Sequence, residues 1–369
     1  MSCITILIAY GTRPEAIKMA PVVRELKRRG DRFKVVVCAT AQHRAMMDQV
    51  HEVFALEADI DLDLMRPDQT LNGLSARCFE GVDKVLGKTK PDWVLVQGDT
   101  TTAMVVALAA FHRGIPVGHV EAGLRTGDLR HPFPEEANRR IIDVFAEALF
   151  APTLRAADAL RREGVADERI HVTGNTGIDA LLQVADTLPP EPVRDEVLIT
   201  VHRRESFGEP IRQIFQAIRE LSARFPDHRW VYPVHRNPNV VHVAEEMLSG
   251  LVNVELCAPF DYLELVRHQR CARLILTDSG GIQEEAPTFG TPVLVLRRTT
   301  ERPEGVDAGV ARLVGTNRET IVAETSLLLE DPQARAAMTG QANPYGDGRA
   351  AERIACSLAG ESWTPFEAD

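Results

Sequence analysis

The sequence lacks several features that would indicate particular classes of protein. It has no excess of positive charge, because 53 acidic and 42 basic residues give a net charge of −11. A broad binding surface for nucleic acid or for an anionic membrane is therefore not expected. No apolar run approaches the ~18 residues of a membrane-spanning helix, and the first apolar stretch, residues 4–10, is too short for a signal sequence. We expect a soluble, cytoplasmic protein that binds phosphate only locally.

The spacing of the cysteines and of the glycines excludes a zinc site and a dinucleotide-binding site. The six cysteines include no CxxC pair, and no Cys/His cluster has the spacing of a zinc site. Cys3, Cys38 and Cys257 fall in apolar strand-like runs, which predicts reduced, buried thiols. The first apolar run ends in GTRPE and lacks the GxGxxG fingerprint of dinucleotide binding. We therefore expect neither a metal nor a cofactor.

Short β-branched runs alternate with amphipathic segments along the chain. Near-continuous apolar strands between helices are typical of parallel sheets covered on both faces, so the pattern predicts an α/β, doubly wound architecture. The pattern runs twice, and a segment rich in proline and acid, residues 188–196, precedes the second set. We expect two Rossmann-like domains, 1–170 and 171–350, with a last helix near 350–369 packing back on the first. The predicted strands are residues 4–10, 34–40, 93–97, 116–121, 148–152, 197–202, 229–235, 252–256, 272–277, 291–296 and 310–315.

The residues that follow these strands are the candidates for function. Ligands of open α/β sheets bind beyond the carboxyl ends of the strands. Nearly every predicted strand here ends in charged residues or glycine, which a structural scaffold does not need. Two sheets with such ends facing each other would form one cleft. We therefore expect the active site in the interdomain cleft.

The stretch DSGGIQEE, residues 278–285, follows a strand and opens a helix. Glycines at such a turn let backbone N–H groups approach an anion, and the helix N-terminus favours negative charge. Ser279, Gly280 and Gly281 are therefore candidates for phosphate binding. The alternative is a plain helix start that is capped by Asp278 or Ser279.

Other strand ends are ambiguous when each is considered alone. Arg13 precedes a helix and could bind a phosphate through its guanidinium, with Lys18 one turn further on; the alternative is a capped helix with solvated charges. Asp99 has the position of either a catalytic acid or a helix cap. His202 opens a loop together with two arginines, although a lone histidine is more often structural. Arg302 follows another strand end and is a further candidate; the alternative is an ordinary polar loop.

The segment 119–140, HVEAGLRTGDLRHPFPEEANRR, is denser in ionisable groups. Glu121 ends a strand, and Glu135 and Glu136 open a helix. Acidic residues in a first turn also make an ordinary stable helix start. The number of ionisable groups nevertheless exceeds what capping requires, so the long loop 124–133 and its neighbours are interpreted as functional.

Taken together, these motifs resemble one family. GTRPEAIKMAP, GDTTT, HVEAGLRTGD, PEEANR, HRRESFG and TDSGGIQEE…TTERPE resemble the non-hydrolysing UDP-N-acetylglucosamine 2-epimerases, in the same order from Gly11 to about Gly305. The resemblance implies a GT-B-like fold and interconversion of UDP-GlcNAc and UDP-ManNAc by a homodimer, for cell-surface polysaccharide precursors. No carbonyl acidifies the C2 proton of the sugar. Without NAD, the remaining route is elimination of UDP to 2-acetamidoglucal, followed by re-addition, which needs general acids and bases.

The resemblance also implies roles for individual residues. Its catalytic positions match Asp99, Glu121, Glu135 and His202, and the sequence does not decide which carboxylate removes the C2 proton. Its substrate-binding positions match Arg13, Lys18, Arg139, Ser279, Gly280, Gly281, Glu285 and Arg302. Among these, Glu285 would bind the ribose hydroxyls. The role of its neighbour Glu284 stays open, with a solvated helix residue as the simplest interpretation.

Many bacterial members of this family have a second, allosteric UDP-GlcNAc site. Its positions match Gln42, His43, Glu136, Arg203 and His235. Two further positions depart from the family pattern, because Ala45 stands where glutamine is frequent and Asp68 where arginine is frequent. Loss of an arginine near a diphosphate would remove a strong charge-assisted contact. The sequence therefore leaves allosteric activation open.

Three other functions remain as alternatives. A hydrolysing epimerase would release ManNAc and UDP, and a GT-B glycosyltransferase would need an acceptor pocket. A non-catalytic nucleotide-sugar sensor would need phosphate and ribose ligands, but it would not need the candidate carboxylates together with His202.

Overall fold

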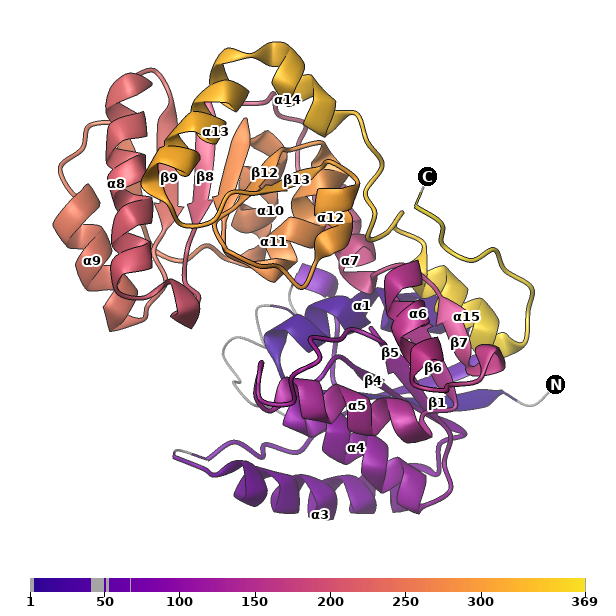
Figure 1. Cartoon of the computed structure of the whole chain (residues 1–369). Helices are drawn as coiled ribbons and strands as arrows, with labels where there is room; N and C mark the ends of the chain where they lie inside the picture. The colour runs from indigo at the N-terminus through magenta and orange to yellow at the C-terminus, as the bar shows by residue number, and fades with distance from the viewer. Residues whose placement is uncertain (1–2, 41–49, 51–52, 67, 369) are drawn as a thin grey trace. The chain divides into compact units, whose positions relative to one another are not determined.

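The computed structural model describes residues 3–40, 50, 53–66 and 68–368, which divide into two compact units. Unit 1 comprises Met1–Gln183 and Gly346–Glu367, and unit 2 comprises Val184–Tyr345 and Ala368–Asp369. Each unit is built on its own parallel sheet with helices packed against it (Figure 1). The two sheets confirm the predicted α/β, doubly wound architecture.

The sheet of unit 1 has, within the described residues, seven parallel strands in the order β3-β2-β1-β4-β5-β6-β7. The order reverses between β1 and β4, so their C-terminal ends flank the switch point where such sheets bind ligands. The strands are β1 (Ile4–Tyr10), β2 (Phe33–Ala39), β3 (Ile60–Asp61), β4 (Trp93–Gln97), β5 (Val117–Val120), β6 (Ala148–Ala151) and β7 (Ile170–Val172). The helices are α1 (Arg13–Arg28), α3 (Leu71–Thr89), α4 (Thr101–His112), α5 (Glu135–Phe145), α6 (Leu154–Arg162), η1 (Asp167–Arg169), α7 (Thr176–Ala185) and α15 (Ala350–Ala359).

The sheet of unit 2 has six parallel strands in the described part of the chain, in the order β10-β9-β8-β11-β12-β13. Its switch point lies between β8 and β11. The strands are β8 (Glu196–Thr200), β9 (Arg229–Pro233), β10 (Val254–Cys257), β11 (Leu274–Thr277), β12 (Val293–Val295) and β13 (Ala311–Leu313). The helices are η2 (Arg204–Ser206), α8 (Glu209–Arg224), α9 (Pro238–Leu248), α10 (Tyr262–Cys271), α11 (Gly280–Glu285), η3 (Ala286–Phe289), α12 (Pro303–Asp307), α13 (Arg318–Glu330) and α14 (Pro332–Thr339).

Every predicted strand overlaps an observed one, whereas two short strands of the described residues are absent from the prediction. β3 contributes only the pairs Cys38↔Ile60 and Ala39↔Asp61 to the sheet, and β7 has three residues. Segments of this length contain too few positions for a period-2 pattern to emerge. Their pairing is decided by the neighbouring strand, which the local sequence does not reveal.

The boundary between the units lies after Gln183 instead of at the expected residue 170. Helix α7 belongs largely to unit 1, because its Asp179 accepts hydrogen bonds from the backbone N–H groups of Ala350 at 3.2 Å and Ala351 at 2.8 Å. These residues begin α15, which packs beside α1 (Figure 1). The acid- and proline-rich segment, residues 188–196, begins five residues after this division.

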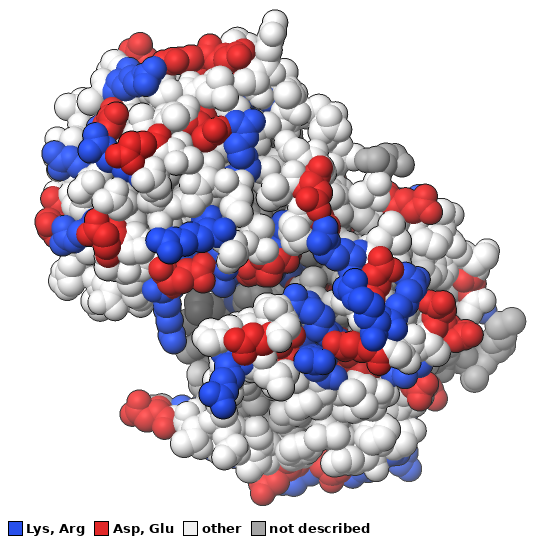
Figure 2. All heavy atoms as spheres, in the orientation of Figure 1, with Lys and Arg blue, Asp and Glu red and all other residues white. Residues whose placement is uncertain are grey.

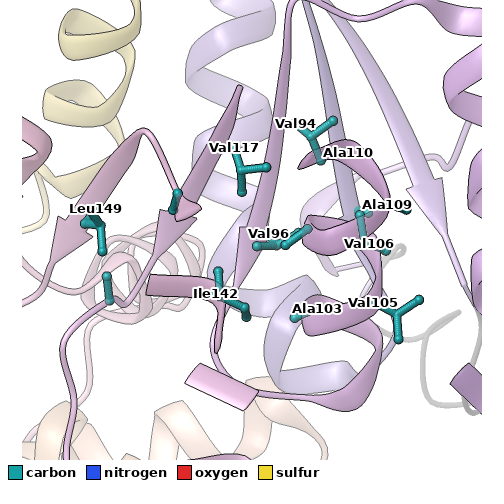
Figure 3. Packing of buried hydrophobic residues seen from close by; sticks show 14 of the residues in the cluster. Val94, Val96, Ala103, Val105, Val106, Ala109, Ala110, Val117, Ile142 and Leu149 are labelled. Carbon is teal, nitrogen blue, oxygen red and sulfur yellow. The ribbon is translucent and has the colours of Figure 1, made fainter. Parts of the chain in front are cut away.

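The core of unit 1 holds β4 and α4 together. Val94 and Val96 of β4 are fully buried against Ala103 and Val106 of α4, and Ile142 of α5 closes the same cluster (Figure 3). Burial of each such branched side chain contributes about 1.5–3 kcal/mol. Because β4 and α4 are joined by the short turn that contains Asp99, this packing fixes the position of a candidate catalytic residue.

The surface of the described residues agrees with the composition. Acidic and basic side chains are intermixed on the face shown in Figure 2, and no described helix is long and apolar enough to cross a membrane. The prediction for Cys3 is wrong: this thiol is exposed because β1 begins only at Ile4, whereas Cys38 is buried and Cys257 half-buried.

Candidate active site

In unit 1, Glu121 lies directly after β5 in a strained backbone conformation. Its φ is 69°, in the left-handed region that costs a residue other than glycine about 1–3 kcal/mol. Its carboxylate is only 10% exposed and pairs with the ammonium of Lys18. The side-chain amide of Gln97 donates a second hydrogen bond to the same oxygen at 2.7 Å. A strained backbone and two side-chain donors hold this carboxylate in one orientation.

Asp99 follows β4 and is held from helix α5. The Arg139 guanidinium donates to its Oδ2 atom, and the Asn138 side chain donates to its backbone carbonyl at 2.9 Å. The Asp99 side chain is 29% exposed, so a ligand can reach it. Asp99 does not cap α4, whose N-cap is Thr100. The structure therefore removes helix capping as the alternative explanation for this residue.

The two acids that open α5 have different environments. Glu135 is half-buried and lines a cavity of about 460 Å³ in unit 1, together with Thr12, Thr100 and Asp68. Glu136 is fully buried, and its carboxylate accepts hydrogen bonds from the N–H groups of Thr126 at 3.1 Å and Gly127 at 3.3 Å. It also pairs with Arg139 at 3.3 Å. Glu136 therefore anchors the loop 124–133, whereas Glu135 faces open space.

Glu15 is a buried acid that sequence reasoning did not single out. Its carboxylate accepts hydrogen bonds from Gly11 N at 3.0 Å, Thr12 N at 2.7 Å and the Thr100 hydroxyl at 2.7 Å. Burial raises its pKa, although these hydrogen bonds oppose the shift. Glu15 thus joins the loop after β1 to the loop after β4. Its place three residues after Thr12, in a capping box, is the signal that the sequence offered.

The same loop places both basic candidates of α1. Arg13 is the first residue of the helix and is half-buried, and Lys18 lies one turn further along. Lys18 reaches Glu121, so α1 delivers a cation to the end of β5. The residues at the ends of β1, β4 and β5 are therefore brought together, as the parallel order of these strands requires.

In unit 2, Asp278 organises the loop that begins with His202. This carboxylate is fully buried and accepts hydrogen bonds from His202 N at 2.9 Å, Arg203 N at 2.9 Å and the Ser206 hydroxyl at 3.1 Å. The N-cap of the following helix is Ser279 instead. Asp278 is thus neither a cap nor a ligand of phosphate, and it fixes the histidine loop.

His202 is partly exposed and has a lowered pKa. Burial is the main cause, and Asp278 opposes it from 3.4 Å between Nδ1 and Oδ1. The nearby charges of His235 and Arg203 lower the pKa of His202 further. The His235 ring is stacked on that of His202, with 5.4 Å between centroids. A neutral imidazole can accept a proton at one ring nitrogen and donate a hydrogen bond from the other.

Arg302 lies against the Ser279–Gly281 turn and is bonded to Glu284. The Arg302 Nε atom donates to Glu284 at 2.8 Å. A Cβ added to Gly280 would lie 2.8 Å from the Arg302 Cζ atom, so the guanidinium lies directly against this glycine. Glu284 is 4% exposed, so the interpretation as a solvated helix residue is wrong. It positions an arginine beside this turn, whose Ser279 N–H already donates to the Thr277 hydroxyl at 2.9 Å, and a guanidinium there favours an anion.

Glu285 is half-buried and lies one turn after Gly280 and Gly281. The amide of Gln269, which is fully buried in α10, donates to its Oε2 atom at 2.7 Å. A carboxylate held in this way can accept hydrogen bonds from hydroxyl donors such as those of a ribose.

The candidates for a second ligand site are described only in part. Gln42, His43 and the departing residue Ala45 lie outside the described residues. Arg203 lies 3.6 Å from Glu301, and His235 is exposed beside His202. Within the described ranges, no group of three or more His, Cys, Asp or Glu side chains could hold a metal ion.

Comparisons with known proteins agree with the motifs. The family model described as UDP-N-acetylglucosamine 2-epimerase matches residues 24–359. The UDP-N-acetylglucosamine 2-epimerase of Yersinia pestis is 50% identical over 368 residues, with 96% of this chain and 98% of that protein covered.

Solved structures show the same relationship. The UDP-GlcNAc 2-epimerase of Neisseria meningitidis, in a structure bound to UDP-GlcNAc, is 44% identical with a TM-score of 0.90, covering 97% of this chain and all (100%) of that one. The UDP-GlcNAc 2-epimerase of Methanocaldococcus jannaschii, in complex with UDP-GlcNAc and UDP, is 34% identical with a TM-score of 0.80, covering 96% and 99%. These similarities confirm the expected GT-B-like fold and the family resemblance, and the chain belongs to the UDP-N-acetylglucosamine 2-epimerase family.

Proposed function

We propose that this chain interconverts UDP-GlcNAc and UDP-ManNAc without hydrolysis. A base removes the C2 proton, the C1–O bond breaks, and UDP leaves with the electron pair, so that 2-acetamidoglucal forms. UDP then adds back at C1 while a proton is delivered to the opposite face of C2. Membership of the family and the bound UDP-GlcNAc of the Neisseria relative support this substrate.

The observation that carries the proposal is the fixed carboxylate of Glu121. A carboxylate that is nearly desolvated and rigidly oriented suits proton transfer, since its reorganisation during the reaction costs little. Asp99 and Glu135 supply two further carboxylates at neighbouring segments of unit 1. We assign the sugar to these three residues, and the proton-transfer step to one of them.

We assign the nucleotide to residues of unit 2. Arg302 and the Ser279–Gly281 turn would stabilise the diphosphate as it leaves, because a guanidinium and backbone amides both favour an anion. Glu285 would accept hydrogen bonds from the ribose hydroxyls. The neutral His202 would then be free to donate a hydrogen bond to the departing diphosphate or to take a proton from it. Arg13, Lys18 and Arg139 are assigned to substrate binding in unit 1.

Hydrogen exchange tests the reaction directly. Incubation with UDP-GlcNAc in D2O, followed by NMR, should place deuterium at C2 of both UDP-sugars with little free UDP. Release of free ManNAc would indicate a hydrolysing epimerase. Binding of UDP-GlcNAc without any exchange would indicate a glycosyltransferase or a sensor, and either result would overturn the proposal.

Substitutions test the assigned roles. Asp99→Asn, Glu121→Gln and His202→Asn should keep UDP binding but lose turnover by about 10²–10⁴-fold, the usual contribution of general acid–base catalysis. Glu25→Gln is a matched control away from the candidate site, near the end of α1, where the half-buried Glu25 pairs with Arg28 and Arg29. It should keep full turnover. Wild-type rates in the three test variants would contradict the assignment.

The proposal extends to regulation and assembly. We propose a cytoplasmic homodimer that supplies ManNAc for cell-surface polysaccharide, with a second UDP-GlcNAc site at Gln42, His43, Glu136, Arg203 and His235. Support for that site comes from the family resemblance, although Glu136 already binds the loop 124–133. Light scattering would give the oligomeric state. Conversion of UDP-ManNAc that accelerates on addition of UDP-GlcNAc would support activation, whereas unchanged rates would contradict it.

A further inference from the structure

A buried histidine and a buried aspartate in unit 1 are not used by the proposed mechanism. His119 of β5 is fully buried, and its Nδ1 atom lies 2.5 Å from Oδ1 of Asp143, which is 2% exposed. Its Nε2 atom lies 2.7 Å from the backbone carbonyl of Gly98. A carbonyl and a carboxylate both accept hydrogen bonds, so both ring nitrogens must donate. The ring is therefore an imidazolium, and Asp143 offsets the cost of burying its charge.

The second oxygen of Asp143 is also occupied. The Arg125 guanidinium donates to Oδ2 at 2.7 Å, and the backbone N–H of Gly123 donates to the same atom at 3.3 Å. Burial alone would raise the pKa of Asp143, but His119 and Arg125 outweigh it and hold the pKa below its usual value. Arg125 is shared with Glu163, to which it donates at 2.8 and 2.9 Å. The carboxylate is thus ionised and saturated with donors.

This pair lies where the three candidate catalytic segments meet. The carbonyl that accepts from His119 belongs to the residue directly before Asp99. His119 itself stands two residues before Glu121, and Gly123, which Asp143 binds, stands two residues after it. Asp143 lies on α5, the helix that begins at Glu135. One ion pair therefore joins the ends of β4 and β5 to α5.

We infer that His119 and Asp143 are positioning residues for the reaction proposed above, and that their ion pair sets the relative placement of Asp99 and Glu121. The inference rests on the proposed function. Neither side chain reaches solvent, so neither touches substrate. Their effect is exerted through the carbonyl of Gly98 and the N–H of Gly123, which orient the turns on which the two carboxylates stand. Since both bonds are directed, an uncharged or shorter side chain does not reproduce them.

The test is a pair of amide variants. Asparagine at 119 is too short to bridge both acceptors, and asparagine at 143 replaces one acceptor oxygen by a donor. His119→Asn and Asp143→Asn should each lower kcat for C2 exchange by about 100-fold, the cost of a misplacement of about 1 Å. UDP affinity, measured by calorimetry, should stay at the wild-type value because the hydrogen bonds of the pair reach Gly98, Gly123 and Arg125, none of which is assigned to UDP.

Two variants of buried residues in the same unit control for lost stability. His171 of β7 is half-buried beside Phe150 and Trp363, and Asp179 is a buried carboxylate that accepts hydrogen bonds from two backbone N–H groups. His171→Asn and Asp179→Asn should lower the melting temperature but keep kcat. If His119→Asn and Asp143→Asn remain folded with wild-type kcat, or if all four variants lose kcat in proportion to stability, the inference is overturned.

A measurement on the unaltered protein covers the case in which the variants do not fold. In NMR spectra of protein that contains ¹⁵N-labelled histidine, the His119 ring should show two N–H resonances that exchange slowly with solvent. Observation of only one ring N–H at this residue would overturn the charged pair. Failure of the two proposals can be distinguished: wild-type protein without C2 exchange overturns the proposed function and this inference with it. Wild-type exchange together with fully active amide variants overturns this inference alone.

Discussion

Replacement of Gly280 by alanine is expected to weaken UDP binding through Arg302. A Cβ at residue 280 would lie 2.8 Å from Cζ, 2.9 Å from Nε and 3.1 Å from Nη1 of Arg302. Ordinary contacts begin at 3.4 Å, so the guanidinium must move by about 0.6 Å, the difference between 3.4 and 2.8 Å. That shift stretches the 2.8 Å hydrogen bond to Glu284. The arginine then keeps its second carboxylate partner, Glu301, which lies 2.8 Å from Nη1, but loses the one that holds Nε.

The expected size follows from one lost charge-assisted contact. A hydrogen bond to a charged group contributes about 1.5–3 kcal/mol, so the Kd of UDP should rise by about 10- to 150-fold. The effect on the fold is a balance of two contributions, because the weakened contact of the buried Glu284 carboxylate costs stability. The backbone of Gly280 is outside the left-handed region, and alanine there restricts the unfolded chain, which stabilises the fold by about 0.4–1 kcal/mol.

A double-mutant cycle tests whether the effect acts through Arg302. UDP affinity is measured by calorimetry for Gly280→Ala, Arg302→Ala and the double variant, with melting temperatures as a check on folding. Once Arg302 is removed, the added methyl group has no guanidinium to displace, so Gly280→Ala should cause no further loss. Additive losses would mean that the methyl group obstructs the ligand itself, and the reasoning would be refuted.

Two further predictions concern buried ionisable groups. Burial raises the pKa of Asp179 from 3.8 to about 7, although backbone N–H groups oppose it. The folded state therefore keeps a proton that the unfolded chain releases, so the free energy of unfolding should fall by about 3 kcal/mol from about pH 5 to above about pH 7. Urea denaturation should show this fall and a smaller one in Asp179→Asn; an equal fall in both would contradict the assignment. Burial also raises the pKa of Cys38 and Cys78 to about 12, so native alkylation should modify the exposed Cys3 first, and rapid labelling of Cys38 in mass spectra would contradict the structure.

Local sequence was sufficient for most of the elements. Long apolar runs such as residues 4–10 and strongly amphipathic segments such as α8 have a period that is set by the residues themselves. Elements defined by a distant partner were missed, as β3 and β7 show. The division after Gln183 likewise depends on a distant partner, because α7 is held by a helix that begins some 170 residues later, as the separation of 171 between Asp179 and Ala350 shows.

The motifs likewise identified the segments of the candidate site but not the function of every residue in them. Glu121 and Asp99 are candidates because of their type and their position at strand ends, and Lys18 because of its place in the helix that follows the first strand. The sequence did not distinguish Glu284, which holds Arg302, from a solvated helix residue, nor Asp278, which holds the His202 loop, from a helix cap. These roles depend on partners that are far away in the chain.

The sequence by itself thus determined the family, the α/β architecture and the segments from which a nucleotide-sugar site is built, because motif order, apolar periodicity and strand-end residues are local properties. Only the tertiary structure decided which buried charges support those segments. Glu15, Asp278 and the His119–Asp143 pair each join elements that are separated by loops or by whole strands. A buried charge is tolerated only when a partner of matching geometry meets it, and that meeting is a property of the folded chain.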